Sequence, residues 1–204
     1  MNVGIYSMHW DNIDPRVPNH QKAVFNHFGM PLNQHRINGI DHGEWMDWVL
    51  QRNEDDDIIV FFDADCIPID KDKTIQYIKI ALDGSLVGNT QASNHLDASR
   101  TFAAPSFLSV NRKMWKKLGK PSCKAHYDGD VAQMLTDTWV YHQQSVFLLP
   151  VSSFEVAKWD LPNNPQSYGI GTVYGDANYH LFEVRSNENI ERFVNKAKGV
   201  LNAI

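Results

Sequence analysis

The sequence predicts an α/β fold with a mostly parallel central sheet, helices on both faces and a small second mixed sheet. Three observations lead to this prediction. The first half of the chain alternates apolar runs and amphipathic segments in the order β-α-β-α-β, which is typical of parallel strands joined by helical crossovers. The run 58–62 is apolar throughout, as expected for a strand buried on both faces. After Pro150 the pattern loosens into short strands and turns.

The elements of the first half follow from the positions of the apolar residues. Apolar stretches predict strands at 3–6, 32–37 and 58–62. Apolar residues at helical spacing predict a helix at 21–28, which Gly29 ends, and another at 44–51.

The same patterns continue less regularly through the second half. Helices are expected at 74–82, 111–118, 131–141 and 188–201. Strands are expected at 84–87, 102–110, 152–156 and 181–184. Prolines and glycines mark 160–176 as a loop that is long enough to be a binding lid.

Length, composition and charge limit the class of protein. A chain of 204 residues without an internal repeat or linker is expected to form a single domain over residues 1–204. Its composition, 43% hydrophobic and 21% charged, is that of a globular protein. A net charge of −5 lacks the electrostatic footprint of a nucleic-acid binder, so no nucleic-acid partner is expected.

The expected location is cytoplasmic. No apolar run is long enough to span a bilayer, and the first residues have the pattern of a strand rather than of a signal peptide. The two cysteines, Cys66 and Cys123, are far apart and form no CxxC motif, which favours free thiols in a reducing compartment.

Two carboxylates, Asp63 and Asp65, directly follow the predicted strand 58–62. Ligands of open α/β sheets bind outside the carboxyl ends of the strands, so this pair lies where a ligand is expected. Alternation along an extended chain points both side chains the same way and Ala64 the opposite way. A Mg²⁺ or Mn²⁺ ion bridging to a pyrophosphate would relieve their mutual repulsion. The alternative is that they are solvated loop aspartates or cap the next helix.

Three segments together resemble the GT-A family of glycosyltransferases, whose Rossmann-type fold binds nucleotide-sugars. Asp63-Ala64-Asp65 is similar to the DxD motif, the segment 103–110 to the one that leads toward the acceptor, and Tyr179-His180-Leu181 to the C-terminal segment with a metal-binding histidine. The resemblance implies that Asp65 and His180 coordinate Mn²⁺ or Mg²⁺ and that Asp63 contacts the ribose or the metal. The alternative for His180 is a histidine of the core or the surface.

The chain departs from the family at its xED motif, where Tyr127-Asp128-Gly129-Asp130-Val131 has glycine in place of glutamate. Under the resemblance, Asp130 is the candidate catalytic base, and Asp128 is the second choice. Either aspartate could instead cap the helix expected at 131. The glycine-rich loop of the family is also absent, because Ala103-Ala104 stands there. These departures leave open whether the transfer inverts or retains the anomeric configuration.

The nucleotide is expected near the end of the first strand. Tyr6, Ser7 and Trp10 lie there, and Ala64 lies between the two aspartates. The ring of Tyr6 or Trp10 could stack on the base, or Trp10 could pack on the core or an adjacent loop.

Five further residues have weaker assignments. Asp41 is expected to cap the helix that follows it, although Asp41 or His42 could also approach the nucleotide. Arg100 and Lys22 could neutralise a pyrophosphate or be solvated surface groups. Trp159 could stack on a sugar or anchor its loop.

The resemblance implies a hexosyltransferase that moves a sugar from a nucleotide-sugar, with a UDP-sugar as the expected donor, to a hydroxyl of a glycan, lipid or protein. The alternatives are a metal-dependent nucleotidyltransferase, a nucleotide-sugar binding module that has lost catalysis, and a phosphatase of the haloacid-dehalogenase type. The phosphatase is disfavoured because its motif lies on an early strand and has Thr or Val where this chain has Ile67.

Overall fold

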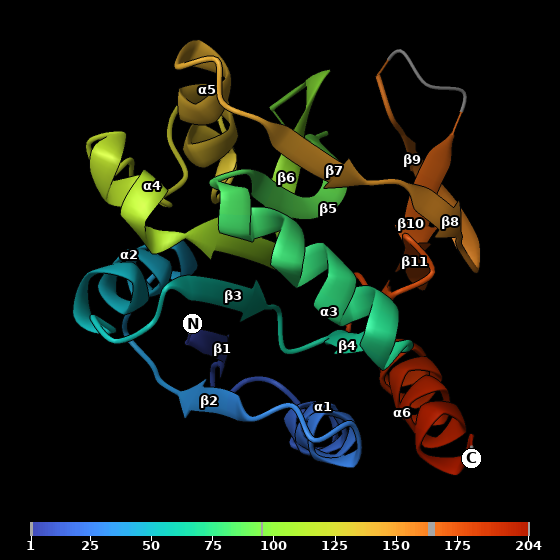
Figure 1. Cartoon of the computed structure of the whole chain (residues 1–204). Coiled ribbons are helices and arrows are strands. Elements are labelled where there is room, and N and C mark those ends of the chain that lie inside the picture. The colour runs from blue at the N-terminus through green and yellow to red at the C-terminus, as the bar shows by residue number, and fades with distance from the viewer. Residues whose placement is uncertain (1, 95, 163–165, 204) are drawn as a thin grey trace.

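A six-stranded mixed sheet forms the centre of the molecule in the computed structural model, which describes residues 2–94, 96–162 and 166–203 (Figure 1). The strand order is β2-β1-β3-β6-β5-β7. Three of the five neighbouring pairs are parallel, and β6 runs antiparallel to both of its neighbours. The strands are β1 (Val3–His9), β2 (Leu32–Arg36), β3 (Ile58–Phe62), β5 (Leu86–Ser93), β6 (Asp97–Asn111) and β7 (Val146–Leu149).

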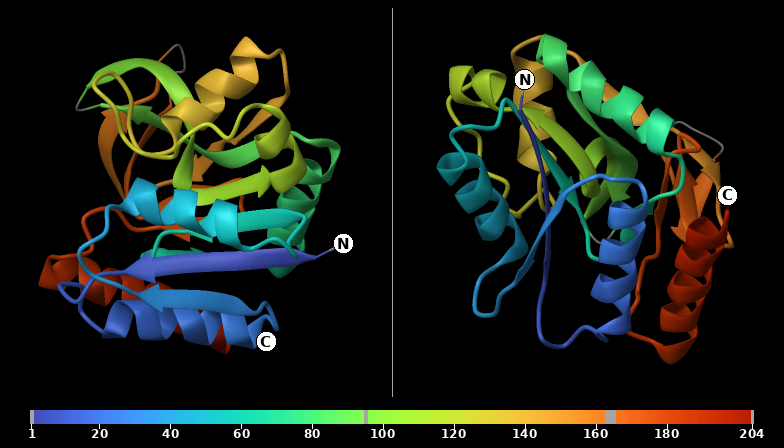
Figure 2. Two further views of the ribbon diagram at one scale, coloured as in Figure 1. Left: turned by 90° about the vertical axis from the view of Figure 1, so that its left-hand side faces the viewer. Right: turned by 60° about the horizontal axis from the view of Figure 1, so that its bottom comes forward.

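Helices cover both faces of this sheet, as the right-hand view of Figure 2 shows. One face packs against α2 (His42–Arg52), α4 (Arg112–Lys117) and α5 (Gln133–Tyr141). The other face packs against α1 (Arg16–His27) and α3 (Lys71–Ile80), which continues into a short 3₁₀ helix, Ala81–Asp83.

Strand β3 lies between these two layers. Ile59 and Phe61 belong to the core under α2, whereas Ile58, Val60 and Phe62 belong to the core under α1 and α3. All five side chains are at most 1% exposed, which confirms the strand buried on both faces. The next residue, Asp63, therefore emerges at the carboxyl edge of the sheet.

A smaller antiparallel sheet has the order β4-β12-β11-β8. Its strands are β4 (Cys66–Pro68), β8 (Val151–Ser153), β11 (Thr172–Tyr174) and β12 (Asn178–His180). The hairpin of β9 (Val156–Asp160) and β10 (Ser167–Ile170) lies beside it, and the C-terminal helix α6 (Asn187–Asn202) packs on α1. Because β4 follows the two aspartates directly and pairs with β12, this sheet brings residues 178–180 close to them.

Two predictions about the second half are wrong. Residues 181–184 form a turn rather than a strand, and the strand β12 lies three residues earlier. The stretch 160–176 is not a long loop, because it contains β10 and β11; its residues 163–165 lie outside the described part. Every residue of β12 is buried although two of the three are polar, so no apolar alternation marks this strand in the sequence. No helix in the described ranges is long and apolar enough to cross a membrane.

Arg112 joins α2 to the start of α4. Its side chain is 5% exposed, and its guanidinium donates to the carbonyl oxygens of Leu50 at 2.8 Å and of Gln51 and Glu54 at 3.2 Å. The last carbonyl groups of a helix have no partner within the helix, and a cation there also opposes the helix dipole. Arg112 therefore stabilises the C-terminal end of the helix whose other end reaches the candidate site.

We expect Arg112→Lys to lower the free energy of unfolding by about 2 kcal/mol, because one ammonium cannot replace three fixed charged hydrogen bonds. For a chain of this length that is a fall in Tm of roughly 4–8 °C, measured by thermal unfolding. Lys113→Ala, at the exposed neighbouring position, is the control and should leave Tm unchanged. If Arg112→Lys and Lys113→Ala changed Tm equally, Arg112 would have no special role at the end of α2.

Candidate functional site

The turn that carries Asp63 and Asp65 is held by a buried glutamine. The amide nitrogen of Gln21, on α1, donates to the carbonyl oxygen of Asp63 at 2.6 Å and to that of Cys66 at 2.9 Å. The backbone N–H of Cys66 donates to the Asp63 carbonyl at 2.9 Å. Both carboxylates are thus fixed at the strand end with side chains that are 24% and 17% exposed.

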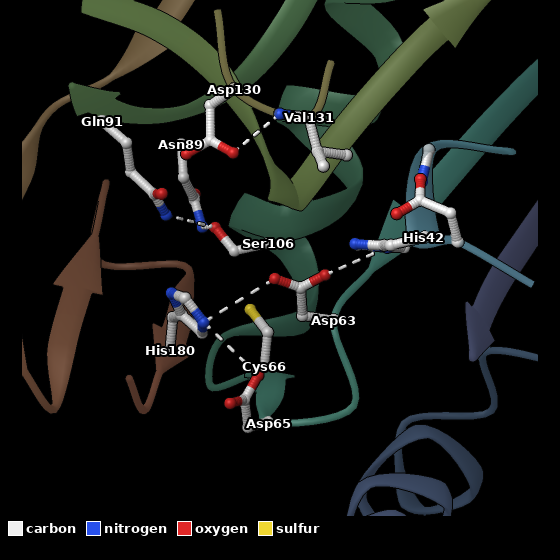
Figure 3. A network of polar contacts seen from close by, with 12 residues as sticks. His42, Asp63, Asp65, Cys66, Asn89, Gln91, Ser106, Asp130, Val131 and His180 are labelled. Atoms are coloured by element: carbon white, nitrogen blue, oxygen red, sulfur yellow. Dashed lines mark hydrogen bonds and ion pairs between the residues drawn. The ribbon is translucent and has the colours of Figure 1, made fainter. Parts of the chain in front are cut away.

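The antiparallel pairing of β4 with β12 brings His180 to this turn. Cys66 lies opposite His180 in the register, and the N–H of Leu181 donates to the carbonyl oxygen of Asp65 at 3.0 Å. The Nε2 atom of His180 lies 3.3 Å from Asp65 Oδ1 and 3.8 Å from Asp63 Oδ2 (Figure 3). The His180 side chain is only 5% exposed.

A second histidine, His42, faces Asp63 from the other side. Its Nε2 atom lies 3.5 Å from Asp63 Oδ1, and its ring stacks on Trp45 with 5.9 Å between centroids. The preceding residue, Asp41, accepts hydrogen bonds from the N–H groups of Gly43 and Glu44. Asp41 is therefore the helix cap that the sequence predicts, and His42 is the residue that reaches the site.

The donor atoms of Asp63, Asp65 and His180 could hold a metal ion, because they all lie within 4.8 Å of one another. Burial raises the pKa of Asp63; the charges of Asp65 and Asp130 raise it further, whereas His42 and His180 oppose the shift. A divalent cation would compensate this crowded negative charge. Carboxylate oxygens with one imidazole nitrogen suit Mn²⁺ or Mg²⁺, so the donor set fits the ion that the resemblance implies.

The cluster lies where two clefts meet. The larger, of about 540 Å³, extends from the end of β1 to the turn before α6, and is lined among others by Trp10, Ala64 and Arg185. The smaller, of about 250 Å³, lies toward β5 and is lined among others by Gln91 and Asp130. His42, Asp63 and Asp65 line both. The larger volume is within the range of small-ligand pockets.

Two of the predicted nucleotide contacts lie outside both clefts. Tyr6 is 6% exposed, and its hydroxyl donates to Asp56 Oδ2 at 2.6 Å. Ser7 is fully buried. The first strand extends to His9, so positions 6 and 7 are interior strand positions whose side chains point into the layers between sheet and helices. Trp10 lies beyond the strand end and does line the larger cleft, with its indole N–H donating to the Ile40 carbonyl at 3.2 Å.

The structure separates the two base candidates. Asp130 lines the smaller cleft, and its Oδ1 accepts from the N–H of Val131 at 2.8 Å. Asp128 lines neither cleft; its Oδ1 lies 2.6 Å from His126 Nδ1. Neither aspartate is the N-cap of α5, because that position is Ala132.

Gly129 stands where the resemblance expects glutamate, and the structure gives a steric reason. A Cβ atom at this position would lie 2.3 Å from Nε2 of His126. The imidazole of His126 therefore occupies the space that a side chain at position 129 would need.

Three residues with weaker assignments, Arg100, Lys22 and Trp159, have positions that a structural or surface role explains. Arg100 pairs with Asp137, and Lys22 is exposed on α1 outside both clefts. Trp159 packs on Tyr168 and Phe182, so it anchors the β9–β10 hairpin.

Two residues of the clefts, Gln91 and Arg185, were not assigned from the sequence, because they reach the clefts only through the tertiary fold. His42, one of the weaker assignments, is positioned by the cap at Asp41, which is a local signal.

We expect Asp63→Asn to raise the free energy of unfolding of the metal-free protein by about 1 kcal/mol, as is common when a functional site is relieved of strain. Because the pKa of Asp63 is raised on folding, its ionised form carries a cost above that pKa, which disappears as the pH falls through it. The extra stability of Asp63→Asn over the wild type should thus decrease as the pH falls.

Thermal unfolding in a chelator measures the gain, with the exposed Asp55→Asn as control. With saturating Mn²⁺ the wild type should be more stable than Asp63→Asn, because metal binding stabilises the wild type and the variant lacks one of the ligands. If Asp63→Asn were less stable than the wild type without metal, the ionised Asp63 would not be destabilising and the prediction would be wrong.

Two of the solved structures that resemble the chain are of a glycosyltransferase, whereas no protein-family model and no curated protein sequence matches it. A mutant of Drosophila β1,4-galactosyltransferase 7 in complex with manganese, UDP-Gal and xylobiose has a TM-score of 0.55 at 13% identity, covering 90% of this chain and 71% of that one. The catalytic domain of the Drosophila enzyme with xylobiose has a TM-score of 0.52 at 14% identity, covering 94% and 79%. The chain therefore has the GT-A fold that its sequence resembles.

Proposed function

We propose that the chain is a metal-dependent glycosyltransferase of the hexosyltransferase type, which moves a sugar from a UDP-sugar to a hydroxyl of a glycan, lipid or protein. The observation that carries the proposal is the cluster of Asp63, Asp65 and His180 at the junction of two clefts. A galactosyltransferase of the same fold forms a complex with manganese and UDP-Gal, which supports the choice of ion and donor.

In this proposal the three clustered side chains hold Mn²⁺ or Mg²⁺. The bound ion would stabilise the negative charge of the departing diphosphate. Gln21 and the β4–β12 pairing keep the side chains in place before the ion arrives, which lowers the cost of binding.

The larger cleft is proposed to hold the nucleotide. Trp10 offers a ring that is fixed by its hydrogen bond to Ile40 and could stack on the uracil. Ala64 leaves room beside the two carboxylates. Arg185 is exposed at this cleft and is placed to meet a diphosphate oxygen.

Asp130 is proposed as the base. It lies across the smaller cleft from the metal cluster, on the side from which an acceptor would approach. The acceptor oxygen attacks the anomeric carbon, its proton passes to the Asp130 carboxylate, and the bond from that carbon to the diphosphate breaks. The pairing of Asp128 with His126 favours a structural role for that aspartate.

We expect UDP with Mn²⁺ to raise the Tm of the wild type by roughly 5–10 °C at a hundredfold excess over Kd. The shift should require both UDP and Mn²⁺ and be lost in Asp65→Ala, because that variant lacks a metal ligand. A thermal-shift series with UDP, GDP, ADP and dTDP measures it. No shift with any of the four nucleotides would overturn the proposal.

We expect Asp130→Asn to lower turnover about a hundredfold or more while UDP affinity is unchanged, because only proton transfer is lost. The measurement is release of UDP from UDP-sugars in the presence of saccharide acceptors. Asp128→Asn is the matched control and should keep most of the activity. A nucleotidyltransferase would release pyrophosphate instead of UDP, and a binding module would release neither. Full activity in Asp130→Asn would show that another group is the base.

A further inference from the structure

A row of polar side chains lies under the smaller cleft. The side-chain amide nitrogens of Asn89 and Gln91, both on β5, donate to the hydroxyl oxygen of Ser106 on β6 at 3.1 and 2.9 Å (Figure 3). Asn89 and Ser106 are fully buried, and Gln91 lines the cleft. Buried amides cost free energy unless they are well paired, so their presence in the middle of a sheet calls for a specific reason.

This row is tied to the metal cluster. The backbone N–H of Asp63 donates to the carbonyl oxygen of Ser106 at 3.3 Å. The hydrogen bond to the Ser106 hydroxyl holds the side chain of Gln91 at the wall of the cleft. A ligand in this cleft therefore meets a fixed side-chain amide, which selects for a hydrogen-bonding group such as a hydroxyl.

The size of the smaller cleft limits what it can hold. At about 250 Å³ it is smaller than the pockets of drug-sized ligands and suits a single sugar ring. It opens from the metal cluster on the side away from Trp10, so a sugar attached to a diphosphate at the cluster would enter it.

The charge of the cleft lining restricts the ring further. The lining includes the carboxylates of Asp63, Asp65, Asp130 and Glu183, and no lysine or arginine is among the described residues that line it. In the proposed function Asp63 and Asp65 hold the cation, and Glu183 pairs with Lys158. The carboxylate of Asp130 would repel an anionic ring such as a uronic acid in a place of reduced dielectric.

We propose that the smaller cleft holds the transferred sugar and that the side-chain amide of Gln91 forms a hydrogen bond with one of its hydroxyl groups. The site thereby selects neutral, hydroxyl-bearing sugars over uronic acids. This inference rests on the proposed glycosyltransferase function and names the substrate class of its donor site.

The test compares the affinities of UDP, UDP-glucose, UDP-galactose and UDP-glucuronate in the presence of Mn²⁺, by calorimetry. In the wild type at least one neutral UDP-hexose should bind about fivefold more tightly than UDP, and UDP-glucuronate should bind no more tightly than UDP. Gln91→Met keeps the length of the side chain and removes the amide. It should bring the affinity for the hexose conjugate down to that for UDP, with UDP itself bound as before.

Two further variants make the outcome decisive. Ser106→Ala releases the Gln91 amide and should reduce the hexose preference in the same direction, which keeps the test available if Gln91→Met does not fold. Gln51→Met, at an exposed glutamine on α2, should change nothing.

The outcomes distinguish this inference from the proposed function. If UDP binds but the hexose preference is absent, survives both cleft variants, or is matched by UDP-glucuronate, then the sugar assignment is wrong and the glycosyltransferase proposal stands. If UDP with Mn²⁺ does not bind at all, both are wrong.

Discussion

The pairing of β4 with β12 is the constraint on which the candidate site depends. It places His180 opposite Cys66, and so against the carboxylates that close the central strand. A register slip of one residue would turn every side chain of β12 to the other face and bring Tyr179 or Leu181 to the cluster instead. The hydrogen bond from Leu181 to the carbonyl of Asp65 fixes that register at the site itself. The antiparallel sheet thus adds a third side chain to the two aspartates, which the central sheet alone cannot supply.

The same arrangement concentrates negative charge in a partly buried place. Asp63 has a raised pKa because burial and the neighbouring carboxylates outweigh the two histidines. Such a site is unfavourable for the stability of the protein without a cation, and the surrounding structure must hold it together. Gln21 does so through the backbone, since its amide fixes the turn without neutralising either carboxylate. The carboxylates therefore remain available to a ligand while the chain around them stays rigid.

The parts of the site that could be predicted from the sequence are those with a local signal. The five apolar residues before Asp63 fix the strand, its burial and its edge. Asp65 lies near Asp63 through a turn, which the hydrogen bond from the N–H of Cys66 to the Asp63 carbonyl closes, and not through the expected alternation along an extended chain. His180 has no such signal, because β12 is short, polar and wholly buried, and only the resemblance to a family singled it out. The assignment of Tyr6 to the nucleotide was wrong for a related reason. The first strand is longer than its apolar run, so the edge of the sheet lies farther along the chain. Gln91 becomes visible only when β5 and β6 are paired, since its partner Ser106 belongs to another strand.

The turn before α5 explains how this chain departs from the family that it resembles. His126 and Gly129 form a backbone bridge, and the His126 ring fills the space beside Gly129 while pairing with Asp128. A glutamate at 129 would have to displace that ring. The carboxylate that lines the cleft is instead one position later, at Asp130, whose backbone N–H donates to the side-chain oxygen of the buried Gln133 at 3.0 Å. Since Gln133 is also bonded to Ser93 on β5, the turn is tied to the strand that carries Gln91. The residue proposed as base and the residue proposed to bind the sugar are therefore both held in place through β5, so that a glycine in the motif does not by itself indicate a loss of catalysis.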